Sequence, residues 1–261
     1  MLRRYKFNES QYEQKSDAFN LSISDLMAGI LAIFILALSY FILNFGQASA
    51  QLTQNNIKRA DLLKEIKEEM KRFEIPVEID QKKGVLTLPD GILFEAGKIE
   101  PNEKGKQVII KLREILYKTL NREEYKGAIE TIFIEGHTDN TPVSPYNPEY
   151  KSNWELSAKR AIATWILLSG EEEKTNKEIV SERNGNLQKE TSDRNVLANL
   201  KNKNGESIFS CSGYADTRGI KNNDTEENRK ANRRIDLRFN MAPPSEEDQE
   251  IIKFIRKSLS K

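Results

Sequence analysis

LSISDLMAGILAIFILALSYFIL (residues 21–43) divides the chain into a short N-terminal part and a long C-terminal part. No charged residue occurs from Leu26 to Leu43, and the core of a bilayer requires roughly 20 helical residues that rise ~1.5 Å each. Asp25 lies just inside the start of this run. A carboxyl group in a membrane helix costs about 2.5–3.5 kcal/mol on insertion scales, which favours a functional role. The alternative is that the span begins at Leu26 and that Asp25 lies among the lipid headgroups.

A cleaved signal peptide is another interpretation of the apolar run. The apolar core of a signal peptide usually has about 7–15 residues and ends at a site of small residues, which Ala48-Ser49-Ala50 resembles. An aspartate inside the apolar core does not fit a cleaved leader, so we predict a transmembrane helix over residues 21–45. Small residues let helices approach closely in lipid, which favours a packed, protein-facing carboxylate. The face with this spacing comprises Asp25, Ala28, Gly29 and Ala32.

Charge sets the predicted orientation and excludes some partners. The net charge of +1 gives no general attraction for nucleic acid, and most of the 31% charged residues follow the span. Arginine and lysine precede the span at positions 3, 4, 6 and 15, whereas none follows it before Lys58. The positive-inside rule therefore predicts a single-pass protein of the bacterial inner membrane with a cytoplasmic N-terminus and a periplasmic domain. The single cysteine, Cys211, is expected to be buried as a small apolar residue or paired with another chain.

The chain is expected to contain five parts. A cytoplasmic stub (1–20) and the transmembrane helix (21–45) precede a linker (46–76), an α/β domain (77–241) and a C-terminal helix (242–261). Residues 47–60 are polar and are expected to be loosely structured. The rest of the linker has an apolar helical stripe of Leu62, Ile66, Met70 and Phe73, ended by Pro76. This stripe either pairs with a second copy or packs on the domain.

Within the domain, strands alternate with helices. This order predicts an α/β sandwich with helices on one face of a mixed sheet. A charged, Asn-rich insertion over 170–206 is expected on the surface. Ser152 and Glu155 form a capping box at the start of a helix. The predicted strands cover 85–88, 131–135, 208–213 and 235–239, and the predicted helices cover 108–120 and 153–168.

The polar residues that could bind a ligand follow the strand at 131–135. Thr138 and Asp139 come directly after it, at a rim where ligands often bind. The helix from Asn153 is expected to turn Trp154, Ala158, Ala161, Ile162 and Trp165 toward the core, with a polar stripe of Asn153, Ser157, Arg160 and Thr164 beside them. Asp139 and Arg160 could meet at the rim, where Asp accepts an ammonium and Arg binds a carboxylate, so the pair suits a zwitterionic ligand. The alternative is a structural salt bridge or a solvated face.

No pattern in the sequence indicates an enzyme. One histidine, His137, and one cysteine make no recognisable metal cluster or Cys–His pair, so no metal site is predicted. There is no Gly-rich phosphate loop and no nucleophile elbow. We therefore expect a binding or mechanical protein without a cofactor.

Four motifs occur in the domain: GHTD (136–139), NxxLSxxRA (153–161), GYA (213–215) and RxxNRRI (229–235). Together they resemble the OmpA-like peptidoglycan-binding domain over roughly Val77 to Met241. The segment Ser152–Ala161 is especially similar to the version in MotB, the B subunit of the flagellar stator. In that family the residues that match Asp139 and Arg160 bind the diaminopimelate of the peptidoglycan stem peptide. The resemblance thus implies a peptidoglycan site formed by Thr138, Asp139, Asn153, Arg160 and Arg233.

The N-terminal segment resembles the same stator family, since Ser24-Asp25-Leu26-Met27 is similar to its ion-binding motif. The resemblance implies that Asp25 carries H⁺ or Na⁺, that residues 46–76 form a plug and linker, and that a dimer lies inside a pentamer of multi-span MotA/ZorA-like subunits. The long insertion makes the chain most similar to ZorB, the MotB-like subunit of the Zorya anti-phage system. A flagellar stator subunit and a passive peptidoglycan tether are the alternatives, and a short ExbD/TolR-type energiser fits less well because such subunits lack this domain.

Overall fold

The computed structural model describes residues 9–170 and 196–243. Most of the predicted insertion and nearly all of the predicted C-terminal helix (242–261) lie outside these residues. The chain divides into two compact units between Gln51 and Leu52, and each is considered separately.

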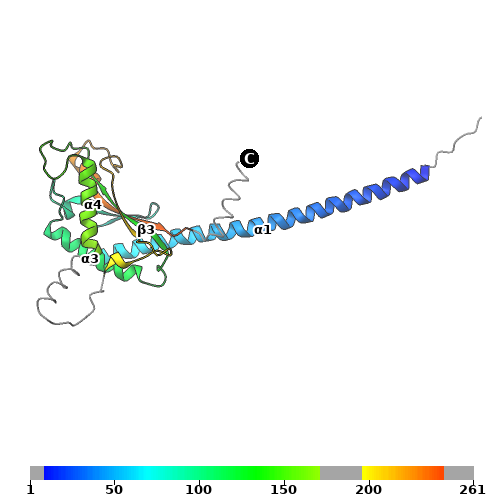
Figure 1. The fold of residues 1–261 in the computed structure, drawn as a ribbon, viewed down its shortest axis with the longest axis horizontal. Helices are drawn as coiled ribbons and strands as arrows, with labels where there is room; N and C mark the ends of the chain where they lie inside the picture. Colours follow the sequence, from blue (N-terminus) through cyan, green and yellow to red (C-terminus); the bar gives the residue numbers. More distant parts are fainter. Residues whose placement is uncertain (1–8, 171–195, 244–261) are drawn as a thin grey trace, which may run out of the picture. The chain divides into compact units, whose positions relative to one another are not determined.

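One helix, α1 (Glu9–Arg72), contains 64 residues (Figure 1). The prediction that residues 47–60 are loosely structured was wrong, because all of them belong to this helix. The segment is polar but contains no proline, and its Ala, Gln, Leu, Lys and Arg residues have good helix propensity.

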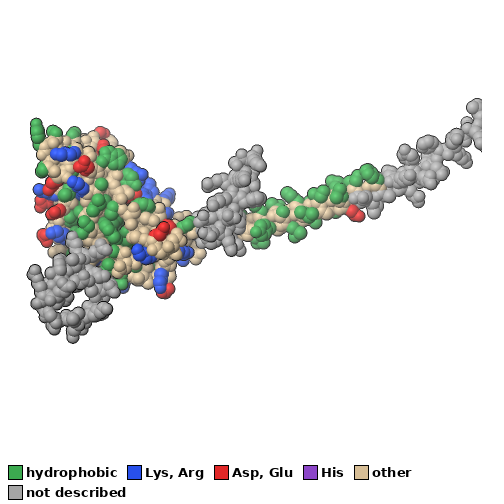
Figure 2. Space-filling model, viewed as in Figure 1, with side chains coloured by type: hydrophobic (Ala, Val, Ile, Leu, Met, Phe, Trp, Pro, Cys, Tyr) green, Lys and Arg blue, Asp and Glu red, His purple; other side chains and the backbone are tan. Residues whose placement is uncertain are grey.

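The N-terminal unit contains a helical segment, Ile23–Gly46, that is long and apolar enough to cross a membrane. Its hydrophobic side chains are exposed, and Figure 2 shows them along this part of the helix. The bounds agree closely with the predicted span over 21–45. Asp25 lies two residues inside the segment and is exposed.

The C-terminal unit is built on a five-stranded sheet in the order β1-β2-β5-β3-β4. Only β3 and β4 pair in parallel, so the predicted mixed sheet is confirmed. The short edge strand β1 was not predicted. The strands are β1 (Glu78–Asp80), β2 (Val85–Pro89), β3 (Ile129–His137), β4 (Phe209–Gly213) and β5 (Arg234–Met241).

Helices cover one face of the sheet, and α4 crosses it in Figure 1. Helix α3 begins after Asn102, whose side chain accepts the Gly105 N–H. Helix α4 begins after the predicted cap Ser152 and ends at Gly170, which has a φ of 78°. The α-helices are α2 (Asp90–Leu93), α3 (Glu103–Leu120), α4 (Asn153–Ser169) and α6 (Glu226–Asn232), and η1 (Leu197–Asn199) is a 3₁₀-helix.

The last turns of α1 belong to the core of the domain. Leu62, Ile66 and Met70 are fully buried in the same hydrophobic cluster as the sheet residues, whereas Phe73 is 48% exposed. The apolar stripe therefore packs on the domain, which decides between the two alternatives left by the sequence. The compact unit accordingly begins at Leu52 rather than at the predicted boundary of 77.

The predicted orientation of α4 is confirmed for Ala161 and Trp165, which lie in or against the core, and was wrong for Trp154 and Ile162. Trp154 and Ile162 are 54% and 47% exposed, while Ser157 and Thr164 of the polar stripe are fully buried. The polar side chains tolerate burial because their hydrogen bonds are satisfied. Ser157 Oγ donates to the Trp154 carbonyl and accepts the Ala215 N–H, and Thr164 Oγ1 donates to the Arg160 carbonyl.

Candidate functional site

The loop after β3 holds Asp139 at the edge of the sheet. The Asp139 carboxylate accepts the Thr141 N–H at 2.9 Å. Asn153, at the start of α4, donates its side-chain amide to the Asp139 and Thr141 carbonyls at 3.2 and 3.0 Å. The Thr138 N–H is bonded to the Ala215 carbonyl at 2.9 Å. Thr138, Asp139 and Asn153 therefore lie together as predicted, and Asn153 positions the loop.

Asp139 forms an ion pair with Arg233, which lies between α6 and β5. The second terminal nitrogen of Arg233 contacts Glu226 at 2.7 Å. Burial opposes ionisation of Asp139, but the hydrogen bonds from Arg233 and Thr141 outweigh it and lower the pKa of this carboxyl. The guanidinium of Arg233 is thus shared between two carboxylates.

Arg160 has a different partner. Its guanidinium contacts Asp90 at 2.6 Å and donates to the carbonyls of Lys98 and Glu95 at 2.8 and 3.2 Å. It also lies over the ring of Phe94 at 4.8 Å. Asp90 is 4% exposed, and burial raises its pKa although Arg160 and Arg233 act in the opposite direction. Arg160 therefore holds the loop that follows α2.

The structure thus brings Asp139 together with Arg233, and the described residues contain no ion pair between Asp139 and Arg160. The charges of Arg160, Arg233 and Asp139 all act on the pKa of Asp90, so these four groups form one electrostatic cluster. Sequence reasoning missed Asp90 and Glu226. Asp90 lies in a Pro-Asp-Gly sequence typical of a turn, and Glu226 is one of many charged residues, so residue type distinguishes neither.

Two polar groups near this cluster have unused hydrogen-bonding capacity in the described residues. Thr138 Oγ1 is buried and makes no hydrogen bond, and neither ring nitrogen of His137 makes one. A buried hydroxyl without a hydrogen bond costs free energy, so a ligand or water that bonds to Thr138 Oγ1 would bind more favourably.

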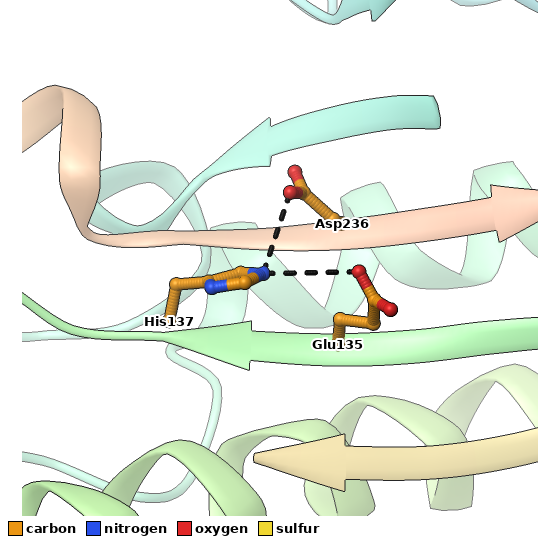
Figure 3. Close-up of side chains that lie close together, drawn as sticks. All are labelled: Glu135, His137 and Asp236. Atoms are coloured by element: carbon orange, nitrogen blue, oxygen red, sulfur yellow. Dashed lines mark ion pairs between the residues drawn. The ribbon is translucent and has the colours of Figure 1, made fainter. Parts of the chain in front are cut away.

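A second cluster lies on the sheet face opposite α4. Glu135 and His137 are two residues apart on β3 and so share one face of the sheet. Glu135 pairs in register with Asp236 of β5 (Figure 3). His137 Nε2 is 3.4 Å from Asp236 and 3.9 Å from Glu135. All three side chains are buried. Burial, aided by nearby arginines, lowers the pKa of His137 to about 3, so the ring is neutral at physiological pH.

This triad has the donor atoms of a metal site, but its charges oppose a divalent cation. Glu135 accepts two hydrogen bonds from Arg238 at 3.0 and 2.7 Å and lies 3.8 Å from Arg218. Asp236 accepts one from Arg234 at 2.9 Å. Three guanidinium groups surround two carboxylates, so an added cation would meet a net positive site. We assign the triad to the internal network of the sheet.

Asp25 has a different environment from the rim. The predicted spacing places it on one face of α1 with Ala28, Gly29 and Ala32, and all four residues are exposed. Apart from its chain neighbours and the backbone of α1 itself, no heavy atom of the described residues would lie within 4 Å of a Cβ atom placed on Gly29. A second helix can therefore approach the backbone beside the carboxylate.

Two proteins of Bacillus subtilis are similar to this chain in sequence. No family model matches. The chain is 26% identical over 271 residues to YtxE from Bacillus subtilis, covering 90% of this chain and 95% of that protein. It is 25% identical over 191 residues to Motility protein B from the same organism. The chain is MotB-like.

The match to Motility protein B covers 73% of this MotB-like chain but 58% of that protein. Among solved structures, a MotB-like protein from Desulfovibrio vulgaris is 17% identical, with a TM-score of 0.49, and covers 73% of this chain and 98% of that one.

Proposed function

We propose that this MotB-like chain is the B subunit of an ion-driven stator in the bacterial inner membrane. In this proposal Asp25 carries H⁺ or Na⁺, and the rim around Asp139 anchors the complex to peptidoglycan. The observation that carries the proposal is that one chain combines an aspartate inside an apolar helix with a separate domain whose rim holds charges of both signs. A mechanical role requires both parts, and no catalytic step is assigned to either.

The membrane part suits ion transfer because protonation changes the cost of the carboxyl in lipid. A neutral carboxyl is cheap to bury and a charged one is expensive, so binding and release of an ion couple to movement of neighbouring helices. One elementary charge that crosses ~100 mV releases about 2.3 kcal/mol. The small residues beside Asp25 fit a second copy of the chain and a surrounding ring of five multi-span subunits.

The rim suits a ligand with an ammonium and a carboxylate, such as the diaminopimelate of a stem peptide. Asp139 is an ionised acceptor, and Arg233 is the guanidinium that lies beside it. In the proposal Asp139 binds the ammonium and Arg233 the carboxylate, while Thr138 offers its free hydroxyl. Asn153 and Arg160 hold the loops that contain Asp139 and Lys98.

We assign the stator to motility first, because the chain is similar to Motility protein B, whose name states that function. Zorya-type anti-phage defence is the second, and the long charged insertion over 170–206 favours it. The two are distinguished by deleting the gene and measuring swimming and phage resistance.

The substitution Asp25→Asn tests the central claim. Asparagine is nearly isosteric with aspartate but cannot bind a proton. The variant should therefore assemble and reach the membrane. It should lose about 90% or more of swimming speed or phage protection. Assembly is checked by copurification with the multi-span subunit. Asp61→Asn, an exposed position of the same helix beyond the span, is the matched control and should be silent. Full function in Asp25→Asn would leave the passive tether as the better description.

A further inference from the structure

The proposed ligand site is filled by the protein's own charged side chains. Asp139 is bonded to Arg233, as it would be to a ligand ammonium. Arg233 is bonded through its other terminal nitrogen to Glu226 at 2.7 Å, as it would be to a ligand carboxylate. The three side chains thus reproduce within one molecule the contacts that a zwitterionic ligand would make.

We propose that Glu226 is an internal competitor that sets the affinity of the rim for its ligand. This inference rests on the proposed function of the rim. A carboxylate binds guanidinium best with two parallel hydrogen bonds, which requires two neighbouring N–H groups of Arg233. Glu226 holds one terminal nitrogen and Asp139 holds the other. While Glu226 holds this nitrogen, it therefore competes with a ligand carboxylate for the two-bond contact.

The surroundings of Glu226 allow it to be displaced. Its side chain is 47% exposed, whereas that of Asp139 is 7% exposed. Glu226 also contacts Arg229 at 3.0 Å, and Arg229 donates to the Asn223 carbonyl. When the ligand displaces it, Glu226 therefore keeps one partner and remains near the rim. Asp139 stays held by the Thr141 N–H in both states.

The experiment compares the full chain in detergent micelles with Glu226→Gln and with Glu227→Gln. Glu227 is the next residue, is exposed and provides the same loss of charge. The probe is free meso-diaminopimelate, with affinity measured by calorimetry. Because exposed ion pairs are weak, Glu226→Gln should bind about 1.5- to 5-fold more tightly than the wild-type chain, and Glu227→Gln should match the wild type.

The outcomes separate the two claims. Equal, measurable affinity in all three proteins would keep the proposed ligand and overturn the role of Glu226. Weaker binding by Glu226→Gln would also overturn it, since Glu226 would then support the site. An absence of binding by all three proteins would reject diaminopimelate as the ligand. It would also reject competition between Glu226 and this ligand. An equal gain from Glu226→Gln and Glu227→Gln would attribute the effect to net charge rather than to the Arg233 contact.

Discussion

Gly136 lies where β3 passes beneath α4. A Cβ atom on Gly136 would lie 2.0 Å from the Ser157 carbonyl oxygen, and one on Gly213, its partner in register, would lie 2.5 Å from the Ala158 nitrogen. This close approach lets Ser157 accept the Ala215 N–H and fixes the chain beside Thr138. Gly136→Ala should therefore lower the free energy of unfolding by about 1–3 kcal/mol, measured by urea denaturation.

Gly91 provides the control for this substitution. Apart from its chain neighbours and the backbone of its own helix, no heavy atom in the described part of the chain lies within 4 Å of a Cβ placed there, and the residue is in the short helix α2. Gly91→Ala should change the free energy of unfolding by less than about 1 kcal/mol, in the stabilising direction if helix propensity dominates. Similar losses for both variants would show that the contact between β3 and α4 is not the cause.

Helix α1 serves two environments, an exposed apolar segment and the core of the domain. Ile66 is fully buried in that core, whereas Ile57, nine residues earlier by numbering, is 56% exposed. Ile66→Ala should destabilise the domain by about 2–5 kcal/mol, because it removes buried methyl groups and leaves a cavity. Ile57→Ala should cost less than about 0.5 kcal/mol. Urea denaturation of the full chain in micelles measures both, and equal effects would place the start of the core elsewhere.

The two proposed activities lie in separate compact units, so they should be lost separately. Asp139→Asn should reduce sedimentation with purified peptidoglycan at least about tenfold, since it removes an ionised acceptor that Arg233 and the ligand both use. Asp25→Asn should sediment like the wild-type chain. Asp216→Asn, an exposed position after β4, is the control for the rim. Peptidoglycan binding that is undiminished in Asp139→Asn would reject the rim as the anchor.

The sequence by itself determined the apolar segment, the mixed α/β sheet, the cap of α4 and three residues that lie together at the rim, Thr138, Asp139 and Asn153. These features depend on hydrophobic run length, on local periodicity and on residue type at fixed spacing, all of which can be read along the chain. Thr138 and Asp139 follow the end of a predicted strand, and Asn153 begins a predicted helix. Their positions at these two ends place the three residues together.

Only the tertiary structure decided which charges pair. Asp139 binds Arg233, 94 residues away, and Arg160 binds Asp90, 70 residues away. The sequence contains many arginines, and the choice of partner depends on loop paths and burial that no local pattern encodes. The tertiary structure also decided which face of α4 is buried. Satisfied hydrogen bonds, and Gly136 and Gly213 of the neighbouring strands, allow its polar stripe to be buried and leave Trp154 exposed. The partner of the α1 stripe was likewise settled by packing, because an apolar face specifies burial but not the surface that covers it.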